Sequence, residues 1–469
     1  MAGAALADAI FESLESEHSF STKYWETQPL LVHRPELAAQ LSALLSAADL
    51  PVLSERLEAR DKVHQCMREG ESCEPRELCW DFLEGGSIIL NKLDVYWPPV
   101  GRLCAALRER FLHVFAVMYL TPRGSRSVPA HSDDQDVFIV QLAGRKAWNV
   151  YGSPIDLPYS HEQLGKTAPV DRASLGAPLL TAELAPGSVL YMPRGFVHEA
   201  RATEGGASLH ITLTVQTSDL NWRTFVGDGL MALHRTHDEA RLPLPLDASA
   251  GGYPEGGAGV GIGRAAEGAV IDGVYSPSVD CTDPTAPCHA PAHASPDASA
   301  DAAEASGAAG GGLGAQSPSS STVDLVRGLM STTASEWSRG FDLAMGMLTT
   351  KLAVLNGAQD AAIATDDGVS LRVGVLPPWL RCPRGVTMAI RPVPVSRAVQ
   401  LVCTKKGGSL TVTFDARFLV PLSFIADSSG SKNKVAAFQP TDLPGCDAFE
   451  QVALCSRLLQ LQALEGCVL

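Results

Sequence analysis

The chain has 469 residues, of which 45% are hydrophobic, and a formal net charge of −15. This length is sufficient for two or three domains with substantial cores, and the negative charge argues against a protein that coats phosphate, so we predict no direct binding of nucleic acid. The 11 cysteines are scattered without a paired framework, which is typical of proteins from a reducing compartment.

The N-terminal sequence MAGAALADAIFESLESEHSF carries acidic residues where a signal or transit peptide would carry basic ones. We therefore expect no targeting peptide. Apolar runs elsewhere are shorter than the roughly 20 residues that a membrane-spanning helix needs. The sequence thus predicts an intracellular protein without membrane association.

Residues 1–113 are predicted to be mostly helical, with amphipathic stretches at 37–57 and 100–111, and to wrap the part that follows. Residues 114–217 contain short β-rich runs with turn residues between them and no helical spacer. These runs are FAVMYLTP, DVFIVQLAG, KAWNVYG, GSVLYMP, FVHEA and LHITLTV. Such a series predicts an antiparallel sandwich or barrel. We expect one hairpin around Gly144 and a second one at the turn Pro193-Arg194-Gly195.

A helical region is predicted for residues 218–246, and its pattern resumes at 322–356. Residues 247–321 between them consist largely of Ala, Gly, Ser, Pro and Asp. Such a segment buries too little apolar surface to offset the entropy of ordering its backbone, so we predict a disordered insertion. Residues 361–469 alternate strand-like runs with a final amphipathic helix at 449–464, which predicts a small α+β domain.

Two histidines and one aspartate have the spacing of a metal site. His131 and Asp133 are two residues apart at the start of a strand-like run, where alternate side chains share a face. His198 follows a later turn, and inward residues of a small barrel can converge on one interior point. Two imidazoles and one carboxylate are the ligand set of non-haem Fe(II) oxygenases, whereas a closed zinc site would require a fourth protein ligand or thiolates. We therefore predict an iron site at His131, Asp133 and His198.

Lys146 begins the strand-like run KAWNVYG. If its side chain points into the barrel, the buried ammonium requires an anion, which an acidic co-substrate would supply. The alternative is a lysine that points to solvent, and the residues alone do not decide between the two. His210 in LHITLTV likewise has two interpretations, as a pocket residue or as a core histidine.

Several motifs together carry a family resemblance. HSDDQDVFIVQLAGRKAWNVY, LYMPRGFVHEA and SLHITLTV, in this order and spacing, resemble the JmjC-type ribosomal oxygenases, which are Fe(II)- and 2-oxoglutarate-dependent dioxygenases with a cupin core. The stretches YWETQPLLVHR, FAVMYLTPRGS and RLPLP add to the similarity. It covers most of residues 20–245 strongly and the C-terminal third weakly.

The resemblance implies a fold and a domain order. The catalytic core at 114–217 would be mainly β, a double-stranded β-helix of the cupin JmjC type wrapped by the helices of 1–113. A helical dimerisation region, residues 218–246 with 322–356, would follow. Residues 361–469 would form a winged-helix-like α+β domain.

The resemblance also implies roles for six residues of this chain. His131, Asp133 and His198 would bind Fe(II), and Lys146 would bind the far carboxylate of 2-oxoglutarate. Tyr119 and Thr214 would line the pocket of the co-substrate and substrate. With O2 as the second co-substrate, the implied reaction is hydroxylation of a side chain of a ribosomal protein, most often histidine.

The implied protein is a homodimer in the nucleus or nucleolus, with the cytosol as the alternative location. Two other functions fit the same residues, namely demethylation of N-methyl-lysine in histones and a catalytically inactive, dimeric cupin-like scaffold. This chain departs from the family at Val117, where asparagine is usual, and at Arg126 and Ser127, where Gln-Gly is usual. Because an isopropyl group cannot replace an amide as a hydrogen-bond partner, the target residue stays open.

Overall fold

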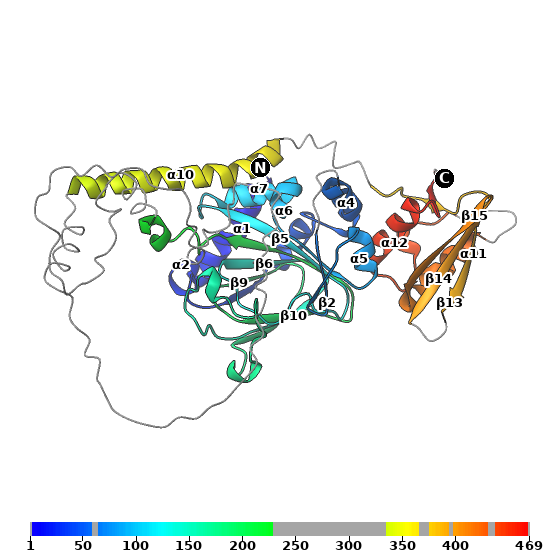
Figure 1. Cartoon of the computed structure of the whole chain (residues 1–469), viewed down its shortest axis with the longest axis horizontal. Helices are drawn as coiled ribbons and strands as arrows, with labels where there is room; N and C mark the ends of the chain where they lie inside the picture. Colours follow the sequence, from blue (N-terminus) through cyan, green and yellow to red (C-terminus); the bar gives the residue numbers. More distant parts are fainter. Residues whose placement is uncertain are drawn as a thin grey trace, which may run out of the picture. The chain divides into compact units, whose positions relative to one another are not determined.

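The structure is a computed structural model that describes residues 2–58, 64–227, 334–364, 375–393, 397–429 and 437–467 (Figure 1). They belong to two compact units, one formed by Met1–Asn221 with Lys351–Leu469 and the other by Trp222–Thr350. The predicted disordered insertion at 247–321 lies outside the described residues.

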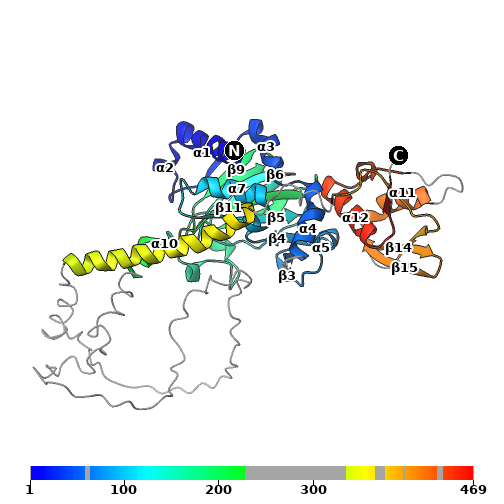
Figure 2. The ribbon, with the colours of Figure 1, turned by 90° about the horizontal axis from the view of Figure 1, so that it is seen from above.

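Two antiparallel sheets form the centre of the first unit (Figures 1 and 2). The larger sheet has eight strands in the order β1-β9-β6-β11-β5-β4-β2-β3, and the smaller has three in the order β10-β7-β8. The strands of the predicted core are β5 (Val114–Thr121), β6 (Asp136–Ala143), β7 (Lys146–Val150), β8 (Leu180–Leu184), β9 (Ser188–Met192), β10 (His198–Ala202) and β11 (Ser208–Val215). This architecture confirms the predicted cupin-type core. Strand β8 was not predicted from the sequence.

Strands β6 and β11 lie side by side in the larger sheet and are buried along almost their whole length. The near-continuous apolar sequence of β6 reflects cover on both of its faces. Strand β11 alternates polar and apolar residues, and its polar face, with Ser208, His210, Thr212 and Thr214, is buried as well. N-terminal helices pack on one face of this sheet (Figure 2). Residues on the other face, among them Ile139 and Thr212, line a cavity together with residues of the smaller sheet.

The predicted hairpins are wrong. Strands β6 and β7 flank Gly144 but pair with different partners, because β6 belongs to the larger sheet and β7 to the smaller one. The same is true of β9 and β10 on either side of Pro193-Arg194-Gly195. Gly144 has φ 64°, and a Cβ there would lie 1.8 Å from the carbonyl oxygen of Ala207. Only glycine therefore fits at this position, where the chain passes from the larger sheet to the smaller one.

The N-terminal region is the helical wrap that the sequence predicts, with four strands in addition. Its helices are α1 (Ala2–His18), α2 (Phe20–Lys23), α3 (Ala38–Ser42), α4 (Leu50–Glu58), α5 (Leu78–Leu83), α6 (Leu93–Tyr96) and α7 (Pro98–Leu107). The strands that extend the larger sheet are β1 (Leu30–His33), β2 (Gln65–Arg68), β3 (Glu71–Cys73) and β4 (Ser87–Leu90). Runs of three or four residues are too short for periodicity to identify them as strands.

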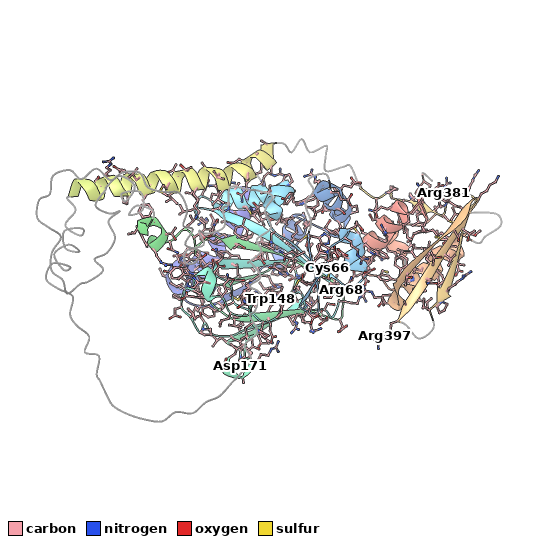
Figure 3. All side chains as sticks on the ribbon, in the orientation of Figure 1. Cys66, Arg68, Trp148, Asp171, Arg381 and Arg397 are labelled. Carbon is pink, nitrogen blue, oxygen red and sulfur yellow. A yellow bond between two sulfur atoms is a disulfide. The ribbon has the colours of Figure 1, made fainter. Side chains whose placement is uncertain are left out.

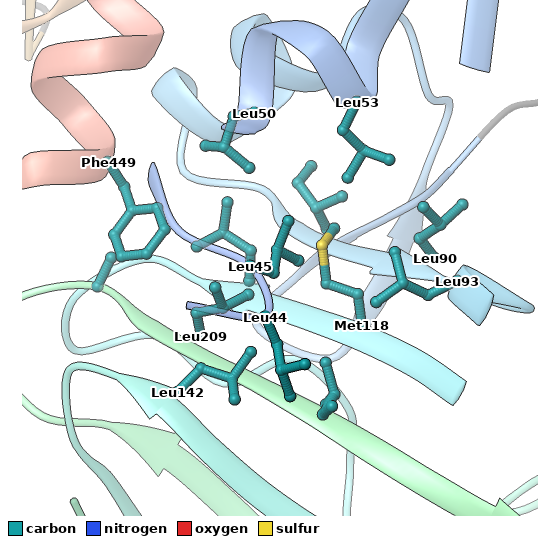
Figure 4. Close-up of a cluster of buried hydrophobic side chains, with 14 of the residues drawn as sticks. Leu44, Leu45, Leu50, Leu53, Leu90, Leu93, Met118, Leu142, Leu209 and Phe449 are labelled. Carbon is teal, nitrogen blue, oxygen red and sulfur yellow. The ribbon is translucent and has the colours of Figure 1, made fainter. Parts of the chain in front are cut away.

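The segment Pro35–Glu58 is apolar and long enough to cross a membrane by length and composition, contrary to our expectation from the sequence. In the structure it is divided into short helical pieces that include α3 and α4. Leu41, Leu45, Leu50 and Leu53 are completely buried. Figure 4 shows the last three of these side chains inside a core cluster, so packing in the core accounts for the apolar character of the segment.

Cys66 and Cys73 form a disulfide, contrary to the expectation that the cysteines are unpaired. They are directly opposed in the register of β2 and β3, seven residues apart in the chain. The short hairpin brings the sulfurs together, a proximity that the spacing of cysteines alone does not predict. Among the described residues, seven cysteines are free, and five of these are buried.

In the predicted dimerisation region, residues 222–227 are helical, and α10 spans Ala334–Ala364. The predicted domain boundary at 361 therefore lies within a helix. From Lys351 onward, α10 belongs to the first unit, where Gln359 donates to Asp94 (2.7 Å) and to the carbonyl oxygen of Val114 (2.6 Å). These contacts fix the end of α10 on the barrel.

The C-terminal region contains a three-stranded sheet and two helices. Its elements are β12 (Leu380–Arg381), β13 (Thr387–Pro392), β14 (Ala398–Lys405), β15 (Gly408–Asp415), α11 (Leu419–Ser429), α12 (Ala448–Gln460) and β16 (Glu465–Gly466). Phe449 of α12 lies in the same apolar cluster as Leu50 of α4 and Leu209 of β11 (Figure 4). Arg123 donates to Glu450 (2.6 Å), which adds a buried ionic contact between the barrel and α12.

Phe138 of β6 stands at the centre of an aromatic cluster and is 1% exposed. Its ring centroid lies 4.8 Å from that of Phe11 and 4.9 Å from that of Tyr191. Replacement of Phe138 by alanine is expected to lower the free energy of unfolding by about 3–5 kcal/mol, because both apolar contact and cavity terms are lost. Denaturant unfolding measures this change.

Leu179, which is 66% exposed, provides the control, and its replacement by alanine is expected to change stability by less than about 0.5 kcal/mol. Equal effects of the two substitutions would contradict the assigned core.

Candidate metal centre

The two segments that carry the metal-site residues lie against each other. His131 and His198 form an isolated antiparallel bridge in which each backbone N–H donates to the other residue's carbonyl, at 3.1 and 2.8 Å. His198 is the first residue of β10, whereas His131 and Asp133 precede β6. The two backbone hydrogen bonds hold the histidine rings 4.3 Å apart between centroids. Residues 67 positions apart in the sequence are thereby brought to one point.

The three side chains converge through their metal-binding atoms. One ligand atom each from His131, Asp133 and His198 lies within 4.8 Å of the other two. The Asp133 carboxylate is 3.5 Å from Nε2 of His131 and 3.6 Å from Nε2 of His198. These separations suit ligands arranged about a common ion at about 2.1 Å from each, because two such ligands at a right angle lie roughly 3 Å apart.

Hydrogen bonds orient both imidazoles. Nδ1 of His131 lies 2.8 Å from the carbonyl oxygen of Pro129, and Nδ1 of His198 lies 3.1 Å from that of Phe196. A carbonyl can only accept, so Nδ1 carries the proton in each ring and Nε2 presents its lone pair to the shared point. This is the tautomer that a metal ligand requires.

The charge states also suit a cation. Burial, together with the neighbouring His131, lowers the pKa of His198 to about 3, so the ring is neutral near pH 7. Burial alone would raise the pKa of Asp133, but Lys166 and the two histidines outweigh it and hold that pKa well below its ordinary value. The site therefore offers two imidazoles and one carboxylate, which is a donor set for Fe(II) that leaves further coordination positions free.

A cavity extends from these three residues. Its wall includes Tyr119, Ser127, Val128, His131, Asp133, Val137, Ile139, Lys146, Trp148, Met192, His198, Glu199, Ala200, His210 and Thr212. Figure 3 shows Trp148 among the strands of the barrel. Its ring centroid lies 5.9 Å from that of His198 and 5.6 Å from that of His210, so Trp148 spans the wall between the metal-site residues and the inner end of the cavity.

Lys146 lies in this cavity with its side chain turned inward and is 2% exposed. The ammonium donates to the hydroxyls of Thr121 and Ser127, each at 3.0 Å, and no carboxylate pairs with it among the described residues. Burial lowers the pKa of Lys146 to about 7. A buried ammonium with only neutral partners is a receptor for an anion, because an anion would remove the electrostatic cost of burial.

Tyr119 and His210 complete the inner end of the cavity. Their rings stack with centroids 4.8 Å apart, and the Lys146 ammonium is 5.8 Å from the centre of the Tyr119 ring. Burial raises the pKa of Tyr119 and lowers that of His210 well below its ordinary value. Both groups are therefore neutral near pH 7. His210 is a cavity residue, which decides between the two interpretations that its sequence leaves open.

Thr214 is buried on the same face of β11 as His210 and Thr212, but it does not line the cavity. Thr212 lies on the cavity wall instead. Val117 shares its strand face with Tyr119 and is also absent from the wall. The period of two along a strand identifies the correct face, but it does not indicate how far the cavity extends.

Sequence reasoning assigned no role to several polar and aromatic residues of the site, among them Ser127, Trp148, Lys166 and Glu199. Ser127 and Trp148 carry a signal, since Ser127 departs from the family pattern and Trp148 stands two residues after Lys146 on the same strand face. Lys166 belongs to the long β7–β8 connection, where no periodicity exists to predict its direction.

Comparison with known proteins identifies the domain that holds this cavity. Residues 95–222 match the JmjC domain family. This part of the chain is therefore similar to a JmjC domain. The match includes all three metal-site residues and every residue of the cavity wall.

Curated relatives include a bifunctional lysine-specific demethylase and histidyl-hydroxylase NO66 from Aedes aegypti, 32% identical over 247 residues, which are 49% of this chain and 38% of that protein. Ribosomal oxygenase 1 from Gallus gallus is 33% identical over 247 residues, 49% of this chain and 40% of that protein. The matched part is thus well under two-thirds of these relatives. A structure of Escherichia coli YcfD in complex with cobalt and 2-oxoglutarate is 14% identical, with a TM-score of 0.33, and covers 96% of this chain and 98% of that chain.

Proposed function

We propose that the protein is an Fe(II)- and 2-oxoglutarate-dependent dioxygenase that hydroxylates a side chain of a ribosomal protein. One observation carries the proposal: a two-histidine, one-aspartate site with free coordination positions and a buried, anion-free lysine share one cavity of the JmjC domain. The curated relatives that share this domain are named ribosomal oxygenases and histidyl-hydroxylases, which supports the substrate class.

In the proposed reaction, His131, Asp133 and His198 hold the metal. Iron and 2-oxoglutarate, when bound, supply the oxidising chemistry, in which a C–H bond, O2 and 2-oxoglutarate give a hydroxyl group, succinate and CO2. One oxygen atom enters the product and the other enters succinate, so the reaction balances without a further reductant.

The protein's own side chains position the co-substrate. Lys146 pairs with the carboxylate far from the metal, and the Thr121 and Ser127 hydroxyls that now accept from its ammonium help to orient it. Val137, Ile139 and Met192 supply an apolar wall that restricts water around the reacting atoms. Tyr119 borders the co-substrate end, whereas Thr214 does not line the cavity.

Histidine is the target that the relatives' names favour, and Val117 in place of the usual asparagine leaves another target residue open. Demethylation of N-methyl-lysine is the second candidate, because a relative is named as a bifunctional demethylase and hydroxylase. The same metal-site residues serve both reactions. A catalytically inactive scaffold is the third candidate, and the complete ligand set argues against it.

The test is incubation of the full chain, loaded anaerobically with Fe(II), with O2 and 2-oxoglutarate and with ribosomal-protein and histone-tail peptides. Mass spectrometry is expected to show the gain of one oxygen on a ribosomal peptide, together with stoichiometric succinate. Loss of a methyl group from a histone peptide with release of formaldehyde would replace hydroxylation by demethylation. Absence of succinate with every peptide would favour the scaffold.

We further propose that the protein is a homodimer. In the second unit, Phe225 packs against Trp222 and Phe341, and the latter two side chains are 79% and 54% exposed. Such exposed aromatic side chains favour burial against a partner.

Three further properties remain predictions from the sequence. They are the winged-helix character of residues 361–469, a nuclear or nucleolar location and the absence of direct nucleic-acid binding.

A further inference from the structure

The connection between β7 and β8 is fastened to the segment that carries His131 and Asp133. Ser132 donates its backbone N–H to the carbonyl oxygen of Leu164 (3.0 Å), and Leu164 donates its N–H to the Ser132 hydroxyl (2.9 Å). Gly165 follows with φ 76°, and a Cβ there would lie 2.3 Å from the carbonyl oxygen of Ala130. Only glycine permits this approach, so the position of the next residue is fixed relative to the metal site.

That next residue is Lys166, whose ammonium donates to Oδ1 of Asp133 at 2.9 Å. The same oxygen lies 3.5 Å from Nε2 of His131. Lys166 is 44% exposed, whereas the carboxylate is largely enclosed. A pair of this exposure contributes little to folding, with a typical value of about 0–1 kcal/mol, so its main effect is expected in binding.

The charges of the site show what Lys166 does. Asp133 gives the metal-site residues one negative charge, and Lys166 cancels it. A divalent cation therefore meets a neutral site and an ammonium close by, which weakens its binding. A dianionic co-substrate on the metal restores attraction, because it offsets the charges of the metal, Lys166 and Lys146 together.

We propose that Lys166 couples the binding of the metal to the binding of the dianionic co-substrate. It disfavours binding of the metal alone and favours binding of the metal together with the co-substrate. This inference rests on the proposed function. Coupling of this kind is reciprocal, so Lys166 also makes co-substrate affinity depend more strongly on the metal. Lys166 is thus a positioning and charge-setting residue of the metal site and contacts no reacting atom.

The test measures metal affinity with and without 2-oxoglutarate in the wild-type chain and in Lys166→Met. Mn(II) serves as a probe under anaerobic conditions, and the fluorescence of Trp148, next to His198, reports its binding. Lys166→Met is expected to bind Mn(II) alone about 10-fold more tightly and to lose about 10-fold of the enhancement by 2-oxoglutarate, which corresponds to about 1.4 kcal/mol of coupling.

Two variants serve as controls. Lys166→Arg keeps the charge and is expected to behave like the wild type. Lys23→Met, at the exposed end of α2, changes the net charge of the chain equally and is expected to leave both affinities unchanged. Circular dichroism establishes that each variant is folded.

Weaker Mn(II) binding by Lys166→Met would overturn the inference, since it would indicate that the lysine only orients the carboxylate. Unchanged coupling would overturn it as well. In both of these outcomes the proposed function stands, provided that the wild-type chain binds Mn(II) and 2-oxoglutarate. If the wild type binds neither, the proposed function fails, and this inference fails with it.

Discussion

Replacement of Asp133 by alanine is expected to abolish metal binding and succinate formation while the chain remains folded. Asp133 supplies the single anionic ligand, and without it only the two imidazoles remain beside the ammonium of Lys166. Loss of a group that only supports a ligand typically costs roughly 10–100-fold in metal affinity, so loss of the ligand itself is expected to cost more. His131→Ala and His198→Ala are expected to have similar effects.

The fold should survive because the bridge between the two ligand segments is made by the backbones of His131 and His198. Asp134→Asn is the matched control. Asp134 is the adjacent carboxylate, accepts from the hydroxyls of Ser160 and Ser218, and is not one of the converging ligands. It is expected to retain metal binding. A folded Asp133→Ala variant with full activity would remove these residues from the metal site.

Replacement of Lys146 by methionine is expected to raise the dissociation constant of 2-oxoglutarate about 100-fold, with metal affinity in the absence of co-substrate nearly unchanged. The attraction between an ammonium and a carboxylate at about 4 Å is roughly 4 kcal/mol at an effective dielectric of about 20, before desolvation is subtracted. A net loss of about 2.7 kcal/mol corresponds to 100-fold. Isothermal titration with the metal-loaded protein measures it directly.

The pKa of Lys146, about 7, adds a pH dependence. The protonated form binds the dianion, and the fraction of that form in the free protein falls as the pH rises above about 7. The dissociation constant of 2-oxoglutarate is therefore expected to increase from pH 7 to pH 9 by up to about 10-fold per unit. Lys146→Arg keeps its charge over this range and should remove the dependence. Unchanged affinity in Lys146→Met at pH 7 would contradict the role of this lysine.

The sequence predicted the chemistry-bearing residues better than their surroundings. His131, Asp133 and His198 have the residue types and the spacing of a metal-ligand set, and that pattern is visible without coordinates. The inward direction of Lys146 and the cavity position of His210 required the structure. Strand β7, which begins at Lys146, alternates buried and more exposed positions, and β11 is buried on both faces, so neither sequence alone indicates which face lines the cavity.

Connections between strands were predicted least well. The sequence of two strands joined by a glycine is the same whether the strands pair with each other or belong to different sheets. At Gly144 the two strands belong to different sheets. Lys166 lies in a long connection whose course depends on the hydrogen bonds between Ser132 and Leu164. Contacts of that kind join residues far apart in the chain, and no local pattern encodes them.

Equilibrium dialysis of the full chain against Mn(II) and 2-oxoglutarate under anaerobic conditions tests the metal centre most directly. One metal ion and one 2-oxoglutarate are expected to bind per chain, with the co-substrate retained only when metal is present. Both are expected to be lost in Asp133→Ala and kept in Asp134→Asn. Binding of 2-oxoglutarate without metal, or binding of metal that survives Asp133→Ala, would contradict a centre built from His131, Asp133 and His198.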